Sequence, residues 1–192
     1  NAGQCPDAVS GFSLGEWSAL VAADVMEPAV AFVLVQKRAD AMQHAVAVGE
    51  GGMLAILGCE DSVVAALCNE VGGGVWPSNY NCPGQVTIAG EKMAIDRVQV
   101  LCEGQGIRCV PIAISVPSHC PLMQPAAEEL RALIENIVLA DARIPVVMNA
   151  TGLAHIGADE IRRNMLCQLT GPVLFSQSLL TLEQMGIELF VE

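Results

Sequence analysis

"SGFSLGE", at residues 10–16, joins a short predicted strand over residues 7–11 to a predicted helix over residues 15–26. Gly11, Ser13 and Gly15 match the Gly-x-Ser-x-Gly pattern of a nucleophile elbow, a sharp strand-to-helix turn that exposes a serine hydroxyl. The two glycines would let the strand and the helix approach closely. The Leu14 N–H would then point to the place where an oxyanion develops. So short a pattern also fits an ordinary serine in a turn, and the partners of Ser13 have to be sought elsewhere in the chain.

Strands and helices alternate on both sides of a central segment. Pro28 opens a long predicted helix over residues 28–46, where its missing N–H costs nothing. After a proline-punctuated loop at residues 115–123, the predicted elements are a helix over 125–138, a buried strand over 144–150, helices over 157–170 and 174–186, and a strand over 187–192. This alternation indicates a parallel α/β core.

The central segment follows a different order. Its predicted elements are a strand over 52–58, a helix over 60–71, strands over 75–81 and 85–89, a helix over 91–104 and a strand over 107–114. The order β-α-β-β-α-β is the ferredoxin-like pattern. We therefore expect a large α/β subdomain formed by residues 1–48 and 116–192, interrupted by a ferredoxin-like small subdomain at residues 49–115.

Composition excludes several classes of protein. Hydrophobic residues make up 53% of the 192 residues and charged residues 16%, so a substantial core can form and disorder is not expected. A formal net charge of −12 argues against nucleic acid as a partner. No apolar run is long enough for a membrane helix, and the first residues lack the basic and apolar regions of a signal peptide. These observations predict a cytoplasmic protein.

The cysteine spacing offers no metal site. None of the eight cysteines forms a C-x-x-C pair, so we expect reduced, mostly buried thiols and neither a disulfide framework nor bound zinc.

A catalytic serine needs a base, and the chain has three histidines. His44 falls on the polar side of a predicted helix and suits a solvated role. His155 falls in a predicted loop before a helix and suits a structural one. His119 lies between two prolines in a loop directly after a predicted strand, where α/β proteins carry their sites. No acid stands out as a triad member, because Asp61 and Asp96 fall within the small subdomain. A Ser–His pair oriented by a neutral group would suit an acyl transferase, which has to avoid giving its acyl group to water.

Arg38 is a scarce cation in an acidic chain, which has nine lysines and arginines in all. It fits an exposed helical arginine in a surface ion pair, which contributes little. It equally fits a bidentate ligand for a substrate carboxylate, a role in which arginine is preferred over lysine. The residues alone leave both readings open.

Six stretches together resemble the malonyl-CoA:acyl carrier protein transacylase family of the stand-alone bacterial type. They are "GFSLGEWSAL", "RADAMQ", "SNYNCPGQVTIAGEK", "SVPSHCPLMQPAAEEL", "IPVVMNATG" and "QLTGPVLFSQSL". The resemblance implies an α/β-hydrolase-like core with an inserted ferredoxin-like subdomain. It also implies transfer of a malonyl group from malonyl-CoA to the phosphopantetheine thiol of acyl carrier protein in fatty acid biosynthesis, through a malonyl-serine intermediate and with no cofactor or metal.

The same resemblance implies roles for individual residues. Ser13 matches the nucleophile, His119 the general base, and Arg38 the arginine that binds the malonyl carboxylate. Gln168 matches a glutamine whose main-chain carbonyl orients the imidazole, and the Leu14 N–H matches one half of the oxyanion hole. Phe12 replaces a residue that is often histidine in the family, and Met42 resembles the residue of malonyl-specific members.

The family also extends beyond both ends of this sequence, and its second oxyanion donor lies in the preceding segment. We therefore expect these 192 residues to be unstable or inactive alone, and the complete protein to be a monomer. Because acyl carrier proteins are acidic, docking needs a local basic patch, for which Lys37, Arg108, Arg162 and Arg163 are candidates unless they are scattered solvated charges. The alternative functions are a serine esterase or thioesterase and a non-catalytic acyl-binding fragment.

Overall fold

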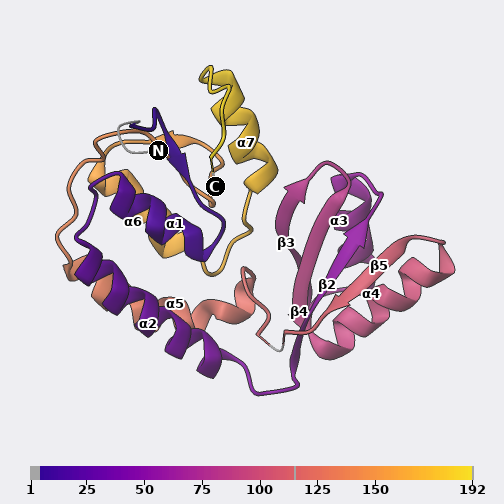
Figure 1. The fold of residues 1–192 in the computed structure, drawn as a ribbon. Helices are drawn as coiled ribbons and strands as arrows, with labels where there is room; N and C mark the ends of the chain where they lie inside the picture. Colours follow the sequence, from indigo (N-terminus) through magenta and orange to yellow (C-terminus); the bar gives the residue numbers. More distant parts are fainter. Residues whose placement is uncertain (1–4, 115, 192) are drawn as a thin grey trace.

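The computed structural model describes residues 5–114 and 116–191, which form two bodies side by side (Figure 1). The first body contains both ends of the described chain. Its elements are β1 (Val9–Ser10), α1 (Leu14–Ala22), α2 (Pro28–Ala45), the 3₁₀ helix η1 (Pro121–Met123), α5 (Gln124–Asn136), β6 (Val146–Val147), β7 (Ala154–His155), α6 (Ala158–Cys167) and α7 (Phe175–Gln184).

The second body is a four-stranded sheet with two helices. Its elements are β2 (Gly51–Leu57), α3 (Asp61–Val71), β3 (Val75–Cys82), β4 (Gln85–Glu91), α4 (Lys92–Gly104) and β5 (Arg108–Ile112). The strand order is β3-β4-β2-β5, and all neighbouring strands are antiparallel. The predicted β-α-β-β-α-β order of elements is confirmed.

The register of this sheet separates its two faces. Leu54 of β2 pairs with Ile88 of β4, and both are buried in one cluster with Val64 of α3 and Val98 of α4. The preceding residue of β2, Met53, points to the opposite face because side chains alternate along a strand. On that face Met53 packs with Cys120, which directly follows His119. The sheet is therefore attached to the loop that carries the candidate base.

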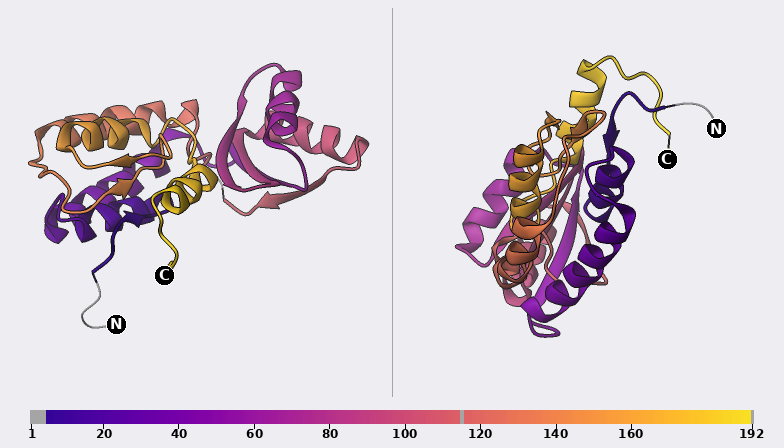
Figure 2. Two further views of the ribbon diagram at one scale, coloured as in Figure 1. Left: turned by 90° about the horizontal axis from the view of Figure 1, so that it is seen from above. Right: turned by 90° about the vertical axis from the view of Figure 1, so that its left-hand side faces the viewer.

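The first body has a separate core between its helices. Leu20 of α1, Leu34 of α2, Leu130 of α5 and Ile161 of α6 are buried in one hydrophobic cluster. Figure 2 shows α1 and α2 on one side of this body and α5 and α6 on the other, with the short strands between them. β6 is buried between these helix pairs, and β1 lies beside it and is partly buried.

The small sheet of the first body is only partly parallel. β1 and β6 are parallel, with Val9 opposite Val146, but β7 pairs with β6 in the antiparallel direction. The predicted strand over 144–150 is reduced to β6, and the segment around His155, expected to be a loop, forms β7. The predicted parallel core is thus represented among the described residues by a single strand pair.

The predicted final strand over 187–192 is wrong for residues 187–191, and residue 192 lies outside the described residues. Leu189, Phe190 and Val191 are exposed, and no strand of the described chain lies beside them. A strand forms only with a hydrogen-bonding partner, so apolar residues alone do not produce one here. Ser115, at the predicted boundary between the subdomains, and residues 1–4 of the predicted large subdomain also lie outside the described residues.

A membrane helix is absent from the described part of the chain, where no helix combines the necessary length and apolar character.

Candidate active site

Ser13 occupies a strained turn between β1 and α1. Its φ is 51° and its ψ is −101°, in a region that side-chain-bearing residues rarely adopt. The close approach of strand and helix needs Gly11, because a Cβ atom there would lie 2.1 Å from the carbonyl carbon of Gly15. Gly15 itself has no such constraint, since a Cβ atom there would meet nothing among the described residues within 4 Å apart from its chain neighbours and the backbone of its own helix. The turn is the sharp elbow that the sequence pattern predicts.

Asn149, at the end of β6, fastens this turn. Its Oδ1 accepts a hydrogen bond from the Ser13 N–H at 2.7 Å, and its Nδ2 donates to the Gly11 carbonyl at 2.7 Å. The Asn149 side chain is buried. Both main-chain contacts therefore lie in a low-dielectric environment, where an unsatisfied polar group would be costly.

The Ser13 hydroxyl meets the imidazole of His119. Ser13 Oγ lies 2.7 Å from His119 Nε2, and His119 Nδ1 lies 2.8 Å from the main-chain oxygen of Gln168. A carbonyl oxygen can only accept, so Nδ1 carries the proton and Nε2 is free to accept the proton of the serine hydroxyl. No carboxylate of the described residues contacts this imidazole, and the group that orients it is neutral.

Burial of His119 lowers the pKa of its imidazole from 6.5 to about 4. The hydrogen bond to Gln168 opposes this shift, and the charge of Arg38 adds to it. His119 is therefore neutral at pH 7, which is the form a general base requires.

Arg38 comes from the middle of α2 and is buried, with 6% of its surface exposed. Its Nη2 donates to Ser13 Oγ at 2.9 Å. Its Nε is buried and has no hydrogen-bond partner within residues 5–114 and 116–191. Burial lowers the pKa of the guanidinium to about 10, against the opposing effect of Glu16, so the group stays charged at neutral pH. Of the two readings of Arg38, the exposed surface cation is excluded.

A buried carboxylate lies beneath the elbow. Glu16 Oε1 accepts from Gln168 Nε2 at 2.7 Å, and Glu16 Oε2 accepts from the Asn149 N–H. Burial raises the pKa of Glu16 to about 7, and the two hydrogen bonds and the charge of Arg38 oppose this rise. Gln168 Nε2 also donates to the Ser13 carbonyl at 3.0 Å, and Gln168 Oε1 accepts from Trp17 Nε1 at 3.4 Å.

Three predicted site residues remain, namely Leu14, Phe12 and Met42. The Leu14 N–H opens helix α1 and donates none of the hydrogen bonds found among the described residues, so it is free to bind an oxyanion. Phe12 packs edge-on against Phe175, with 5.2 Å between the ring centroids. Met42 lies one helical turn beyond Arg38 and packs on the core of the first body, without any hydrogen bond to the Ser13–His119 pair.

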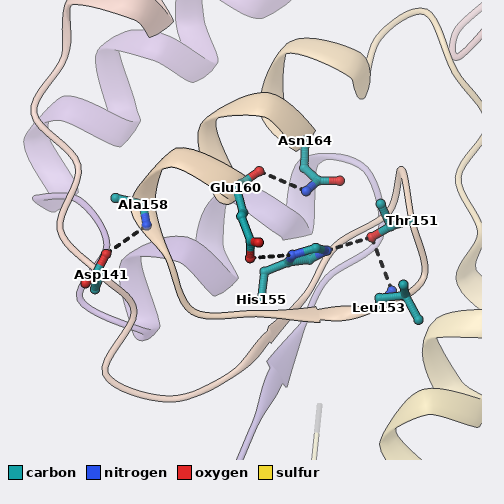
Figure 3. Close-up of polar contacts among 7 residues, drawn as sticks. All are labelled: Asp141, Thr151, Leu153, His155, Ala158, Glu160 and Asn164. Carbon is teal, nitrogen blue, oxygen red and sulfur yellow. Dashed lines mark hydrogen bonds and ion pairs between the residues drawn. The ribbon is translucent and has the colours of Figure 1, made fainter.

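The other two histidines lie outside the candidate site. His44 is exposed near the end of α2, as expected. Figure 3 shows His155 between Thr151 Oγ1, at 3.0 Å from Nε2, and Glu160 Oε2, at 3.3 Å from Nδ1. Thr151 Oγ1 also accepts from the Leu153 N–H within the same turn. These contacts connect the turn after β6 to helix α6, which agrees with the structural role expected for His155.

The thiols are less buried than expected, and one candidate docking residue makes structural hydrogen bonds. Only Cys68, Cys102 and Cys120 are buried among the eight free cysteines, so the thiols are not mostly buried. Arg162, a candidate docking residue, donates to the carbonyls of Ile134 and Ile137. It therefore stabilises the carboxyl end of α5.

Glu16 and Asn149 are the site residues that sequence reasoning did not single out. Each carries a weak signal. Glu16 is an acid within the apolar sequence "LGEWSALVA", and Asn149 directly follows a buried strand, where α/β proteins carry functional side chains. The role of Asn149 at the Ser13 turn could not be predicted from the sequence, because it depends on the pairing of β6 with β1.

A serine, an imidazole and a buried arginine that converge on a strand-to-helix elbow define a candidate centre for serine-mediated acyl transfer. The chain matches the acyl transferase domain family over residues 1–192 and belongs to this family.

Among characterised proteins it is similar to the malonyl CoA-acyl carrier protein transacylase of Escherichia coli K12, with 41% identity over 189 residues. That match covers 97% of this chain and 61% of the relative, so the chain spans less than two thirds of the relative's length.

Solved structures agree in fold. The malonyl CoA-acyl carrier protein transacylase of Coxiella burnetii has a TM-score of 0.94 and 38% identity, and the match covers 97% of this chain and 60% of that one. A malonyl-transacylase solved in complex with a type II PKS acyl-carrier protein has a TM-score of 0.93 and 40% identity, with coverages of 97% and 61%. The mixed α/β fold of this chain is therefore that of malonyl-transacylase structures.

Proposed function

We propose that this chain carries the acyl-transfer centre of a malonyl-CoA:acyl carrier protein transacylase, an acyltransferase of fatty acid biosynthesis. The observation that carries the proposal is the position of Ser13 Oγ, which lies 2.7 Å from His119 Nε2 and 2.9 Å from Arg38 Nη2. A nucleophile is thereby joined to its base and to a cation that can recognise an acidic acyl group. The relatives named above support malonyl as that group.

In the first half-reaction, His119 Nε2 accepts the Ser13 proton as Ser13 Oγ attacks the thioester carbonyl of malonyl-CoA. The Leu14 N–H donates to the oxyanion of the tetrahedral intermediate. When the intermediate collapses, the C–S bond breaks and the coenzyme A thiol leaves with the proton from His119. The product is malonyl-Ser13.

In the second half-reaction, the phosphopantetheine thiol of acyl carrier protein gives its proton to His119 and attacks the malonyl-Ser13 ester. Collapse breaks the ester bond, and the Ser13 oxygen recovers its proton from His119. The malonyl group leaves as a thioester of the carrier protein. The main-chain carbonyl of Gln168 keeps the imidazole in the tautomer that both half-reactions need.

Arg38 selects the acyl group in this proposal. Its guanidinium is buried beside Ser13 Oγ, and its Nε has no partner among the described residues. A malonyl carboxylate would satisfy that donor together with a second N–H of the planar group. Met42 and Phe12 are proposed to line the acyl pocket.

The proposal includes the subdomain boundaries, the location, the oligomeric state and the partners of the protein. Residues 1–48 and 116–192 would form an α/β-hydrolase-like large subdomain, and residues 49–115 a ferredoxin-like small subdomain, whose βαββαβ order supports this assignment. The protein would act in the cytoplasm as a monomer, on malonyl-CoA and acyl carrier protein. The complex of a related malonyl-transacylase with an acyl-carrier protein supports the second partner.

The test is formation of the malonyl-enzyme from radiolabelled malonyl-CoA, measured on the whole protein. Ser13→Ala should abolish the label. Ser18→Ala, an exposed serine one turn along α1, is the matched control and should retain it. A label that persists in Ser13→Ala contradicts the proposal. Faster hydrolysis than transfer in the presence of carrier protein would instead favour an esterase or thioesterase, and absence of any acyl-enzyme would favour a binding fragment.

A further inference from the structure

We infer that Glu16 is a positioning residue of the acyl-transfer centre, which acts through Asn149 and Gln168 on Ser13 and His119. The inference rests on the proposed function only in naming the reaction that Glu16 serves.

Glu16 stands in the first turn of α1, three positions after the nucleophile, and only 1% of its surface is exposed. Its two carboxylate oxygens accept from different parts of the chain. Oε1 accepts from the Gln168 side chain at 2.7 Å and Oε2 accepts from the Asn149 N–H. One carboxylate therefore connects the end of α6 to the end of β6.

The two residues bound by Glu16 enclose Ser13 from both sides. The Asn149 side chain accepts from the Ser13 N–H at 2.7 Å, and Gln168 Nε2 donates to the Ser13 carbonyl at 3.0 Å. A residue at φ 51° stays there only where its surroundings over-determine it. The N–H and the carbonyl of Ser13 are both hydrogen-bonded, and Glu16 binds the two residues that make these bonds. These contacts together hold Ser13 in its conformation.

Gln168 also connects Glu16 to the base. Its amide nitrogen binds Glu16, and its main-chain oxygen accepts from His119 Nδ1 at 2.8 Å. A movement of Gln168 would therefore turn the imidazole and shift the serine turn together. Since proton transfer depends on the 2.7 Å contact between Ser13 Oγ and His119 Nε2, the position of Gln168 should affect the chemical step more than substrate binding.

The hydrogen-bond pattern requires an acceptor at both oxygens. An ionised carboxylate accepts only, whereas a glutamine at the same place would turn an NH₂ toward either the Gln168 amide or the Asn149 N–H. The buried charge of Arg38 compensates the charge of Glu16, because the two groups shift each other's pKa in the directions expected of opposite charges. Glu16→Gln thus keeps the volume of the side chain and removes one of its two acceptors.

The first experiment measures the single-turnover rate of malonyl-Ser13 formation per folded molecule of the whole protein. In Glu16→Gln we expect a fall of about 100-fold at saturating malonyl-CoA, with little change in KM, as for a small displacement of reacting groups. Glu27→Gln is the control, because Glu27 is exposed and its side chain makes no capping hydrogen bond. A wild-type rate in folded Glu16→Gln overturns the inference, since a purely structural Glu16 would alter stability alone.

A second variant covers the case in which Glu16→Gln does not fold. Gln168→Met removes the side chain that joins Glu16 to the site and keeps the carbonyl that binds His119. It should reproduce the loss of rate, and a wild-type rate in Gln168→Met overturns the inference.

A spectroscopic measurement separates this inference from the proposed function. The proton on His119 Nδ1 should give a hydrogen-bonded resonance in the NMR spectrum of the wild-type protein, assigned by its loss in His119→Gln. Glu16→Gln should shift or broaden that resonance, and Glu27→Gln should not. If the wild-type protein forms no malonyl-Ser13, the proposed function fails, while an unchanged resonance in Glu16→Gln overturns the role of Glu16 whatever the reaction is.

Discussion

The Nδ1 atom of His119 lies 2.8 Å from the main-chain oxygen of Gln168, 49 positions later in the sequence. This carbonyl orients the imidazole as the aspartate of a serine protease triad does, but it brings no negative charge to stabilise an imidazolium. Burial makes the imidazole a weak base, with a pKa of about 4, although the hydrogen bond to Gln168 opposes this shift. A weak base suits exchange between thioesters and an oxygen ester, because thiols with a pKa near 8.5 are good leaving groups.

Titration of His119 should reflect its burial. In a histidine NMR titration, its imidazole should protonate near pH 4, well below the ordinary value of 6.5. Because the folded-state pKa lies below that of the unfolded chain, the unfolded state binds more protons between these two values. This group therefore makes the folded state less stable as pH falls from 6.5 toward 4. A midpoint at or above 6.5 would contradict the buried neutral imidazole.

Arg38→Ala should reduce malonyl transfer far more than acetyl transfer. The lost charge-assisted hydrogen bonds correspond to about 2–4 kcal/mol, or roughly 30- to 1,000-fold in kcat/KM for malonyl-CoA. Arg38→Lys should restore only part of this, because an ammonium lacks the planar pair of donors. Arg97→Ala, at an exposed position of α4, is the control. Equal losses for malonyl and acetyl transfer would show that Arg38 does not bind the malonyl carboxylate.

Gly11→Ala and Gly15→Ala should have opposite effects on stability. The Gly11 substituent would meet the Gly15 backbone at 2.1 Å, so we expect a loss of about 3 kcal/mol or more, or a failure to fold. Gly15 lies inside helix α1, and its Cβ position is open among the described residues. Alanine there should stabilise the helix by about 0.5–1 kcal/mol. Urea unfolding measures both, and equal effects would mean that the elbow is wrongly described.

Asn149→Ala should destabilise the protein and slow acylation together. It removes the acceptor of the Ser13 N–H and the donor to the Gly11 carbonyl, both at 2.7 Å. Loss of two buried hydrogen bonds corresponds to about 2–3 kcal/mol of unfolding free energy. Asn136→Ala, on the exposed end of α5, is the control and should stay within about 0.5 kcal/mol of wild type. If the Asn149→Ala protein is as stable as the control, Asn149 does not stabilise the elbow.

The elements of this fold that could be predicted are those with local signals. The helix over Pro28–Ala45 begins at a proline, and strand β4 shows apolar alternation. The strand expected over 187–192 and the short strand β7 were mispredicted because strands depend on a partner from elsewhere in the chain. Resemblance to the family supplied Gln168, which has no local pattern of its own.

For the site, the amino-acid sequence by itself determined the elbow at Ser13, since Gly11 and the strand-to-helix change are local requirements. It also supplied a short set of candidate partners, because so few histidines and arginines are present. Only the tertiary structure decided which of them act together. Burial distinguishes Arg38 from a surface cation, and the neighbouring ends of β1 and β6 bring Asn149 to Ser13. The contact between Asn149 and Ser13 joins residues 136 positions apart. No local sequence pattern can predict it, because the packing of the core sets the distance between the two residues.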